Sequence, residues 1–371
     1  MKKIRVHLKD KAYDILIGRN LLSSSGRFMK PLKTGSKVLI VSNKKISKLF
    51  LNPVQKSLKR SGFQVHTYLL PFGNERDKSS EVLRKIWNEM SHIPLDRTSA
   101  VIALGGGVVG DVVGFAASTY MRGLGVIQIP TTLLAQVDSA IGGKTAIDLP
   151  TAKNIVGSFH QPRLVLADLE ALKYLRPFDV KNQFAEIIKY GIIADTFLFR
   201  LLENRLGRFL SAVEINRFSS TEFKFLEAVV SRSAAIKARV VAEDERETKG
   251  KRMILNYGHT FAHALEGASK FRLPHGQAVA IGMIFAGELA CRMKVFSRAA
   301  QNRQIQLIAK LGLSLDCKFK SAELIQFMRR DKKVKNGKMR FILPKRIGQV
   351  GIYDSIPERL VRGVLDDYRR K

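Results

Sequence analysis

The stretch SAVIALGGGVVGD, from Ser99 to Asp111, decides the fold. It opens with a short apolar run, which is typical of a strand that is buried on both faces of a sheet. Three glycines follow directly, and the residues after them favour a helix. A buried strand that runs through glycines into a helix indicates a parallel sheet whose strands are connected by helices.

The surrounding sequence repeats this alternation. A hairpin is expected over Ile4–Leu8 and Ala12–Gly18. Further strands are expected at Lys37–Ser42, Phe63–Leu70, Val126–Ile129 and Leu164–Ala167, and helices at Lys45–Ser61 and Ser79–Met90. After about Asp168 the pattern becomes helical, over Lys181–Ile193, Asp195–Phe209, Ile215–Val241, Ile254–Glu266, Gln277–Met293 and Ser297–Leu311. The run Asp331–Gly348 predicts a basic hairpin.

A chain of 371 residues is longer than one typical core, so two domains are expected. We predict an α/β protein, with a Rossmann-like parallel-sheet domain over residues 1–168 and an all-helical domain over residues 169–371. Hydrophobic residues make up 45% and charged residues 26%, as in ordinary globular proteins. The N-terminus lacks the apolar core of a signal peptide, and no run approaches the roughly 20 apolar residues of a membrane span. The two cysteines, Cys291 and Cys317, have no metal-binding spacing, and free thiols in a cytoplasmic protein are expected.

The net charge of +32 favours anionic partners. The basic residues are scattered, however, and no basic stripe interleaved with aromatic residues indicates base stacking. We therefore expect a surface bias and an anionic small-molecule substrate rather than a specific nucleic-acid partner.

Two segments of the first domain carry phosphate-binding signals. Gly105, Gly107 and Gly110 satisfy the G-x-G-x-x-G pattern of dinucleotide-binding turns, although such a turn also occurs for packing alone. The segment Tyr120–Phe159 holds a Gly-Gly-Lys-Thr sequence, but the first glycine of a complete P-loop is missing. Its small-residue turns, each followed by lysine, indicate anion recognition.

The helical domain carries the signals for a metal. Three of the seven histidines lie within 22 residues: His259, His263 and His275. His259 and His263 are four apart and share a helix face, so spacing alone favours them as the metal pair. Glu186 and Lys189 also share a helix face. They form either an ordinary salt bridge or, if buried, a site whose carboxylate is the third ligand.

The motifs taken together resemble the 3-dehydroquinate synthase family of sugar-phosphate cyclases. The resemblance spans about Lys37 to Gly348. It rests on GGGVVGD, on the block RG…PTTLLAQVDS…GGKTA…KN, and on AEIIKYGII, KARVVAEDERE, LNYGHTFAHALE, LPHGQAVAIGM and DKK…G…RFILP…IG.

The resemblance implies conversion of 3-deoxy-D-arabino-heptulosonate 7-phosphate to 3-dehydroquinate and phosphate, in the shikimate pathway. NAD+ would oxidise a ring hydroxyl transiently, phosphate would leave by elimination, the hydride would return, and an intramolecular aldol step would close the carbocycle. The resemblance also implies Zn2+ or Co2+, an active site in the cleft between the domains, a cytoplasmic location and a homodimer.

The resemblance also assigns residues. The implied metal ligands are Glu186, His259 and His275, which moves His263 to the substrate side. The implied substrate and catalytic residues are Arg122, Asp138, Lys144, Asn154, Lys189, Lys237, Glu247, Arg252, Asn256, His263 and one of Lys332 and Lys333. The implied NAD-binding residues are Asn43, Glu75, Lys78, Gly106, Gly107, Val108, Gly110, Asp111, Thr131, Thr132, Asp138, Lys144, Lys153, Leu172 and Tyr174.

Three alternatives stay open. Sister cyclases that make inosose or valiolone products would share the metal site and the NAD turn. A metal-dependent polyol dehydrogenase would share the two-domain plan but release NADH. A basic nucleic-acid-binding protein would have no need for Glu186, His259, His275 and Lys144.

Overall fold

The computed structural model describes residues 1–329 and 339–369. They form two compact units, which are considered separately. The first unit holds Met1–Leu175 and Leu226–Arg246, and the second holds Arg176–Phe225 and Glu247–Lys371. The expected boundary after Asp168 differs from this division, because the later part of one long helix, α7 (Ser220–Glu243), belongs to the first unit. Sequence periodicity shows where a helix runs but not which core its face joins.

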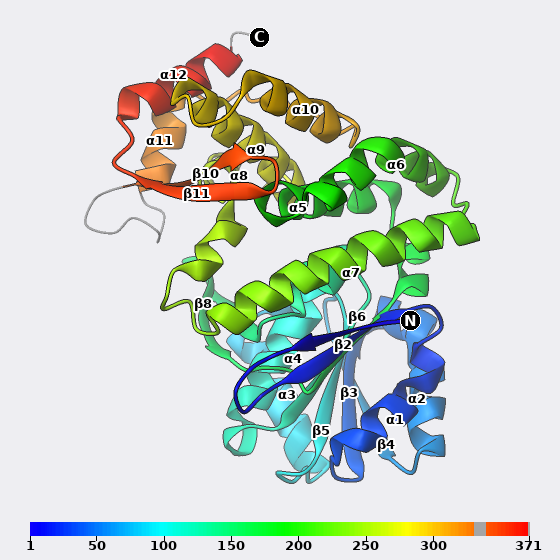
Figure 1. Ribbon diagram of the computed structural model, residues 1–371. Coiled ribbons are helices and arrows are strands. Elements are labelled where there is room, and N and C mark those ends of the chain that lie inside the picture. Colours follow the sequence, from blue (N-terminus) through cyan, green and yellow to red (C-terminus); the bar gives the residue numbers. More distant parts are fainter. Residues whose placement is uncertain (330–338, 370–371) are drawn as a thin grey trace. The chain divides into compact units, whose positions relative to one another are not determined.

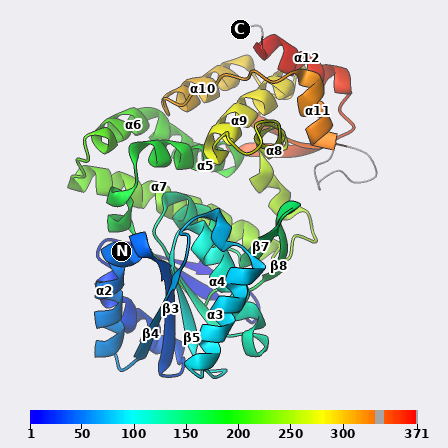
Figure 2. The same ribbon diagram turned by 180° about the vertical axis from the view of Figure 1, so that it is seen from behind.

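A seven-stranded sheet forms the centre of the first unit, in the order β1-β2-β9-β6-β5-β3-β4 (Figures 1 and 2). All neighbours pair in parallel except the edge strand β1, which is antiparallel to β2 and forms the expected hairpin. The strands are β1 (Lys2–Val6), β2 (Tyr13–Gly18), β3 (Lys37–Asn43), β4 (Gln64–Leu70), β5 (Ala100–Gly105), β6 (Gly125–Pro130) and β9 (Leu164–Asp168). Each strand expected from the sequence is therefore confirmed.

Helices cover both faces of this sheet, as Figure 2 shows. Alternate residues of one strand supply the two cores. Val38 and Ile40 of β3 pack with α1 (Ser25–Met29) and α2 (Lys44–Arg60), whereas Leu39 and Val41 pack with α3 (Ser80–His92) and α4 (Gly107–Thr119). Burial on both sides explains the continuous apolar runs of these strands.

The sheet reverses its winding direction between β3 and β5. From β3 the chain moves outward to β4, and then returns to β5 on the other side of β3. In open α/β sheets, ligands bind beyond the carboxyl ends of the strands at such a point. The chain leaves β3 at Asn43 and β5 at Gly105, so the glycine-rich turn lies at this position.

A second, two-stranded hairpin in the first unit is absent from the sequence-based prediction. It pairs β7 (Lys144–Leu149) with β8 (Ala152–Phe159) and packs against α4. β8 is largely exposed, and β7 buries only Thr145 and Ile147, so the two strands lack the apolar alternation by which hydrophobic periodicity would reveal them.

The second unit is mainly helical, as expected. Its helices are α5 (Pro177–Ala194), α6 (Thr196–Glu214), α8 (His259–Ala268), α9 (His275–Arg292), α10 (Arg298–Ala309), α11 (Ser321–Arg329) and α12 (Glu358–Arg369). Helix α9 is buried over most of its length and packs against α5 and α8.

Two boundaries in the second unit correct the sequence-based prediction. Helix α8 begins at His259 rather than Ile254, because Gly258 has a φ of +78° and separates α8 from a 3-10 turn over Lys251–Asn256. The C-terminal hairpin pairs β10 (Arg340–Arg346) with β11 (Gln349–Asp354), later in the chain than expected. Part of the expected hairpin, with Lys332 and Lys333, lies outside the described residues.

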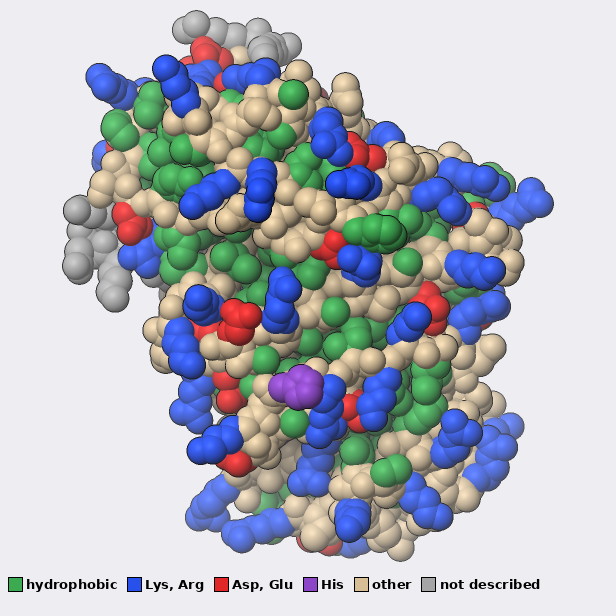
Figure 3. Space-filling model, viewed as in Figure 1, with side chains coloured by type: hydrophobic (Ala, Val, Ile, Leu, Met, Phe, Trp, Pro, Cys, Tyr) green, Lys and Arg blue, Asp and Glu red, His purple; other side chains and the backbone are tan. Residues whose placement is uncertain are grey.

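The basic side chains are dispersed over the face shown in Figure 3, as the sequence distribution indicated. Among the residues that the structure describes, no helix has both the length and the apolar character needed to cross a membrane.

Candidate functional site

Three helices of the second unit bring a carboxylate and two imidazoles together. Glu186 lies in the buried middle of α5, while His259 and His275 are the first residues of α8 and α9. The Nε2 atoms of His259 and His275 each lie 3.2 Å from Oε1 of Glu186. One ligand atom from each residue lies within 4.8 Å of the others, so this group can hold a metal ion.

The other ring nitrogen of each histidine has a partner that fixes the ring. Nδ1 of His275 lies 2.9 Å from Oε1 of Glu266, and Nδ1 of His259 lies 3.1 Å from the backbone oxygen of Tyr257. Such partners orient metal-binding imidazoles so that Nε2 faces the ion. The sequence analysis does not identify Glu266 as a site residue. The signal that could have found it is its acidic side chain on the same helix as His259 and His263.

His263 does not belong to the group of ligand atoms. Its ring lies edge-to-face with that of His259, with 5.6 Å between the centroids. The four-residue spacing therefore places the two rings next to each other, but it does not bring a nitrogen atom of each to one position where both could bind a metal ion. The structure brings His275 to Glu186 instead, and spacing alone could not show that.

Charge is concentrated around Glu186. Lys189, one turn further along α5, forms an ion pair with it, and both side chains are buried. Burial disfavours the carboxylate, but Lys189 and His259 hold the pKa of Glu186 well below its usual value. The carboxylate is therefore anionic at neutral pH. Glu186 therefore takes part both in the expected salt bridge with Lys189 and in the group that can hold a metal ion.

The two histidines differ in protonation in the metal-free protein. Burial lowers the pKa of His259 to about 4. Burial also opposes the charge on His275, but hydrogen bonds to Glu186 and Glu266 outweigh it and raise the pKa of His275 to about 10. At neutral pH, His259 is neutral and His275 carries a proton between two carboxylates.

This difference predicts a pH dependence of metal binding. A metal must displace the proton from His275, so affinity for Zn2+ should rise about tenfold per pH unit from about pH 6.5 to about pH 8.5. Binding should release about one proton, measured by calorimetry in buffers of different ionisation enthalpy. His263→Ala is the control and should keep the slope. An affinity that does not change with pH would contradict the protonated state of His275.

The expected substrate residues of the second unit lie close to this group in sequence. Arg252 and Asn256 belong to the 3-10 turn that precedes α8, and Arg252 is buried. The Nε atom of Arg252 lies 3.5 Å from Oε1 of Glu247, whose φ is +58°. A buried guanidinium is suited to bind a carboxylate with two parallel hydrogen bonds.

The first unit has a cavity of about 880 Å³ where the sheet changes direction. Asn43 lines it from the end of β3, Gly106 to Val108 from the start of α4, and Thr132 from the segment after β6. The helix start offers free N–H groups to an anion. A Cβ atom on Gly106 would lie 3.0 Å from Cγ2 of Thr132, so a side chain there would require Thr132 to shift by a few tenths of an ångström.

The remaining glycines of the motif serve packing. A Cβ atom on Gly105 would lie 2.5 Å from Cγ2 of Val109, and one on Gly110 would lie 2.9 Å from Oε1 of Gln128 on β6. Gly110, which the resemblance places among the NAD residues, thus lets α4 approach the sheet. Asn43 also has a local task, because its side chain accepts a hydrogen bond from the Ile46 N–H and caps α2.

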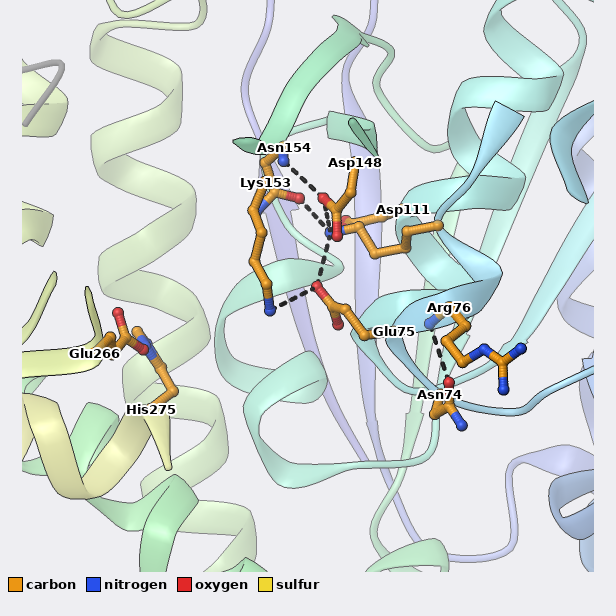
Figure 4. A network of polar contacts seen from close by, with 10 residues as sticks. Asn74, Glu75, Arg76, Asp111, Asp148, Lys153, Asn154, Glu266 and His275 are labelled. Carbon is orange, nitrogen blue, oxygen red and sulfur yellow. Dashed lines mark hydrogen bonds and ion pairs between the residues drawn. The ribbon is translucent and has the colours of Figure 1, made fainter. Parts of the chain in front are cut away.

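Lys78 belongs to a polar network that includes Asp111 of α4, and Figure 4 labels the network members Glu75, Asp111, Asp148, Lys153 and Asn154. Its buried ammonium group donates to Asp111 at 2.8 Å and to Asn154, and it lies 3.8 Å from Glu75. Lys153 lies 3.6 Å from the same oxygen of Glu75. Burial works against the charge on Lys78, but Asp111 raises its pKa, while burial raises the pKa of Asp111 to about 6. The structure thus joins four residues that the resemblance placed in the NAD site, Glu75, Lys78, Asp111 and Lys153, with Asn154, which it placed on the substrate side.

The other expected residues of the first unit are more dispersed. Asp138 accepts a hydrogen bond of 2.6 Å from Lys237 of α7. Thr131 is buried directly after β6, and Lys144 and Arg122 are exposed. Leu172 is buried, whereas Tyr174 is exposed and packs edge-on against Phe50, with ring centroids 5.3 Å apart.

Comparison with protein families identifies both halves of the chain. Residues 68–182 match the N-terminal model of 3-dehydroquinate synthase, and residues 183–334 match its C-terminal model. Curated 3-dehydroquinate synthases are similar over nearly the whole chain. The protein from Picosynechococcus sp. is 43% identical over 97% of both chains, and that from Nostoc sp. is 43% identical over 98% of both.

Solved structures agree on the fold. A 2-deoxy-scyllo-inosose synthase in complex with carbaglucose-6-phosphate, NAD+ and Co2+ is 25% identical, with a TM-score of 0.86 over 99% of this chain and 100% of that one. The 2-epi-5-epi-valiolone synthase ValA from Streptomyces hygroscopicus, with NAD+ and Zn2+ bound, is 26% identical, with a TM-score of 0.86 over 98% of both. A glycerol dehydrogenase from Schizosaccharomyces pombe shares only the fold, at 15% identity and a TM-score of 0.65 over 96% of this chain and 88% of that one. The full-length similarity to curated enzymes and the two family models show that this chain belongs to the 3-dehydroquinate synthase family.

Proposed function

We propose that this protein is a 3-dehydroquinate synthase, a lyase of the shikimate pathway that converts 3-deoxy-D-arabino-heptulosonate 7-phosphate to 3-dehydroquinate and phosphate. The observation that carries the proposal is the 43% identity to curated synthases over 97% of the chain. The group formed by Glu186, His259 and His275 supports it with chemistry that the reaction requires.

The residues present fit both NAD and a divalent metal. One carboxylate with two imidazoles held by outer partners is a donor set typical of catalytic zinc, which keeps coordination positions open. The cavity at the switch in strand order, with the α4 start and the closely packed Gly106, fits a pyrophosphate. When bound, NAD+ supplies a hydride acceptor and the metal supplies a Lewis acid.

The side chains around these groups have separate tasks in the proposal. Glu186, His259 and His275 hold the metal, and Lys189 keeps Glu186 anionic. Arg252 binds the substrate carboxylate. The ion pair of Lys237 with Asp138 places a carboxylate beside a cation and can orient a substrate hydroxyl. Lys78 and its partners hold the cofactor.

Two other functions share this architecture. The inosose and valiolone cyclases have the same TM-score of 0.86, so fold alone does not separate them from the proposed enzyme. Their sequence identity of 25–26% against 43% for the curated synthases favours the dehydroquinate reaction. The dehydrogenase shares the fold at 15% identity, which gives no support for its activity here.

One assay separates these functions. The purified protein is incubated with the heptulosonate phosphate, NAD+ and Zn2+, and phosphate, 3-dehydroquinate and NADH are measured. The proposal expects equal amounts of phosphate and dehydroquinate, with no net NADH. Net NADH would indicate a dehydrogenase, and turnover only of a substrate without the carboxylate would indicate a sister cyclase.

The net charge of +32 leads to a separate prediction. If the basic residues reflect a surface bias, duplex DNA should bind weakly at low salt and be released near physiological salt, since scattered charges supply only counterion release. Fluorescence anisotropy against salt concentration measures this. Binding that persists at physiological salt and depends on base sequence would contradict the expectation.

The homodimer and the cytoplasmic location implied by the family remain predictions.

A further inference from the structure

The β7–β8 hairpin has an irregularity at Asp148. The pairing register shifts between Ile147 and Leu149: Asp148 of β7 lies opposite three residues of β8, 153 to 155, so the extra residues of this bulge-like irregularity belong to β8. Bulges change the direction of a side chain and are common next to active sites. Neither the sequence motifs nor the proposed function gives Asp148 a role.

Asp148 connects two segments that carry expected NAD residues. Its backbone N–H donates to the backbone oxygen of Lys78 at 2.7 Å. Its Oδ1 accepts a hydrogen bond from the backbone N–H of Asn154 at 2.7 Å and lies 3.9 Å from Nζ of Lys78. Asp148 therefore attaches the hairpin to the segment of Lys78, together with Asn154 and Lys153, and Figure 4 shows Asp148 between Asn154 and Asp111.

The bond to Asn154 has a conformational consequence. Asn154 has a φ of +54°, a left-handed conformation that asparagine adopts more readily than most residues and that local hydrogen bonds stabilise. The carboxylate of Asp148 holds the N–H of this residue, and the side-chain oxygen of Asn154 then accepts from Lys78. Loss of that carboxylate would remove a hydrogen bond that fixes the backbone of Asn154 in its orientation toward Lys78.

We infer that Asp148 is a positioning residue for the cofactor: it holds Asn154 and Lys78 in the arrangement that binds NAD. The inference rests on the proposed function, because that function places Lys78 and its partners, Asn154 among them, around the cofactor. Asp148 acts through these two side chains.

The test compares Asp148→Ala and Asp148→Asn, with NAD+ affinity measured by calorimetry on the full-length protein. Asp148→Ala removes the acceptor for the Asn154 N–H and should weaken NAD+ binding by about tenfold or more. Asp148→Asn keeps a side-chain oxygen that can accept from Asn154 and should stay within about threefold of the wild-type affinity. In turnover, Asp148→Ala should raise the KM for NAD+ while kcat at saturating NAD+ changes by less than about threefold.

Asp96→Ala is the matched control. Asp96 is an exposed carboxylate of the same unit that accepts from the backbone N–H groups of Thr98 and Ser99 at 2.8 and 2.9 Å, just before β5 begins. It should lower the thermal midpoint at least as much as Asp148→Ala and leave NAD+ affinity unchanged.

Two results would overturn the inference. One is wild-type NAD+ affinity in Asp148→Ala. The other is a loss of NAD+ affinity that is equal in Asp148→Ala, Asp148→Asn and Asp96→Ala, because that would show a general loss of stability. A wild-type protein that binds no NAD+ would count against the proposed function itself, and would remove the basis of the inference with it.

Discussion

Replacing His275 with alanine should remove the metal from the protein. The imidazole supplies one of three ligands, and its loss should weaken Zn2+ binding by more than about 100-fold, beyond the 10- to 100-fold effect typical of an outer-shell partner. His275 also lies between Glu186 and Glu266, so its loss removes the imidazole that both carboxylates contact. Metal content after gel filtration and competition with a chelator would measure the loss.

His263→Ala is the control, since both residues are imidazoles near the same group. The ring of His263 contacts His259 but is not among the atoms that can share a metal. His263→Ala should therefore retain nearly stoichiometric Zn2+ and lose turnover if His263 contacts the substrate. Equal loss of metal from both variants would show that the four-residue pair His259–His263, favoured by spacing alone, binds the ion.

The strands around the first glycine-rich turn could be predicted because a strand that is buried on both faces has a continuous apolar sequence. β3 and β5 are uninterrupted apolar runs, and each ends at a residue that lines the cavity or lies next to it. The β7–β8 hairpin has no such continuous apolar sequence. Its position is decided by contact with α4, where a Cβ atom on Gly114 would lie 2.4 Å from Cγ2 of Thr145. Complementarity of this kind between distant segments is invisible to local periodicity.

The candidate site divides in the same way. Residue type and spacing identified Glu186 and the three histidines as candidates. Spacing alone, however, favoured a different pair of histidines from the pair that the structure brings together with Glu186. The selection of His275 depends on helix packing, because α9 must begin beside the middle of α5. The acidic Glu266 is visible in the sequence, but its pairing with His275 is decided by the same helix packing. Glu266 lies nine residues before His275, and the partner of His259 is a backbone oxygen, which no side-chain pattern can indicate.

Gly276→Ala should damage both stability and metal binding, because Gly276 lies at the closest approach of α9 to α5. A Cβ atom at this position would lie 1.8 Å from the backbone oxygen of Asn182, so the helices would have to separate. The Asn182 side chain also accepts a hydrogen bond of 2.9 Å from the Gln277 N–H, and separation would break it. Overpacking against backbone that cannot move away should cost at least about 3 kcal/mol.

Such a loss corresponds to a fall of about 6–12 °C in the unfolding temperature for a unit of this size. Because His275 precedes Gly276, Zn2+ affinity should fall together with stability. Gly207→Ala is the matched control: Gly207 is an exposed glycine within α6, and a Cβ atom there meets nothing within 4 Å. It should stabilise the protein by about 0.5–1 kcal/mol, since alanine is the better helix former, and leave metal binding unchanged. Thermal unfolding with and without chelator measures both variants. If Gly276→Ala kept the wild-type unfolding temperature and Zn2+ affinity, the close contact of α5 and α9 would not be what places His275 beside Glu186.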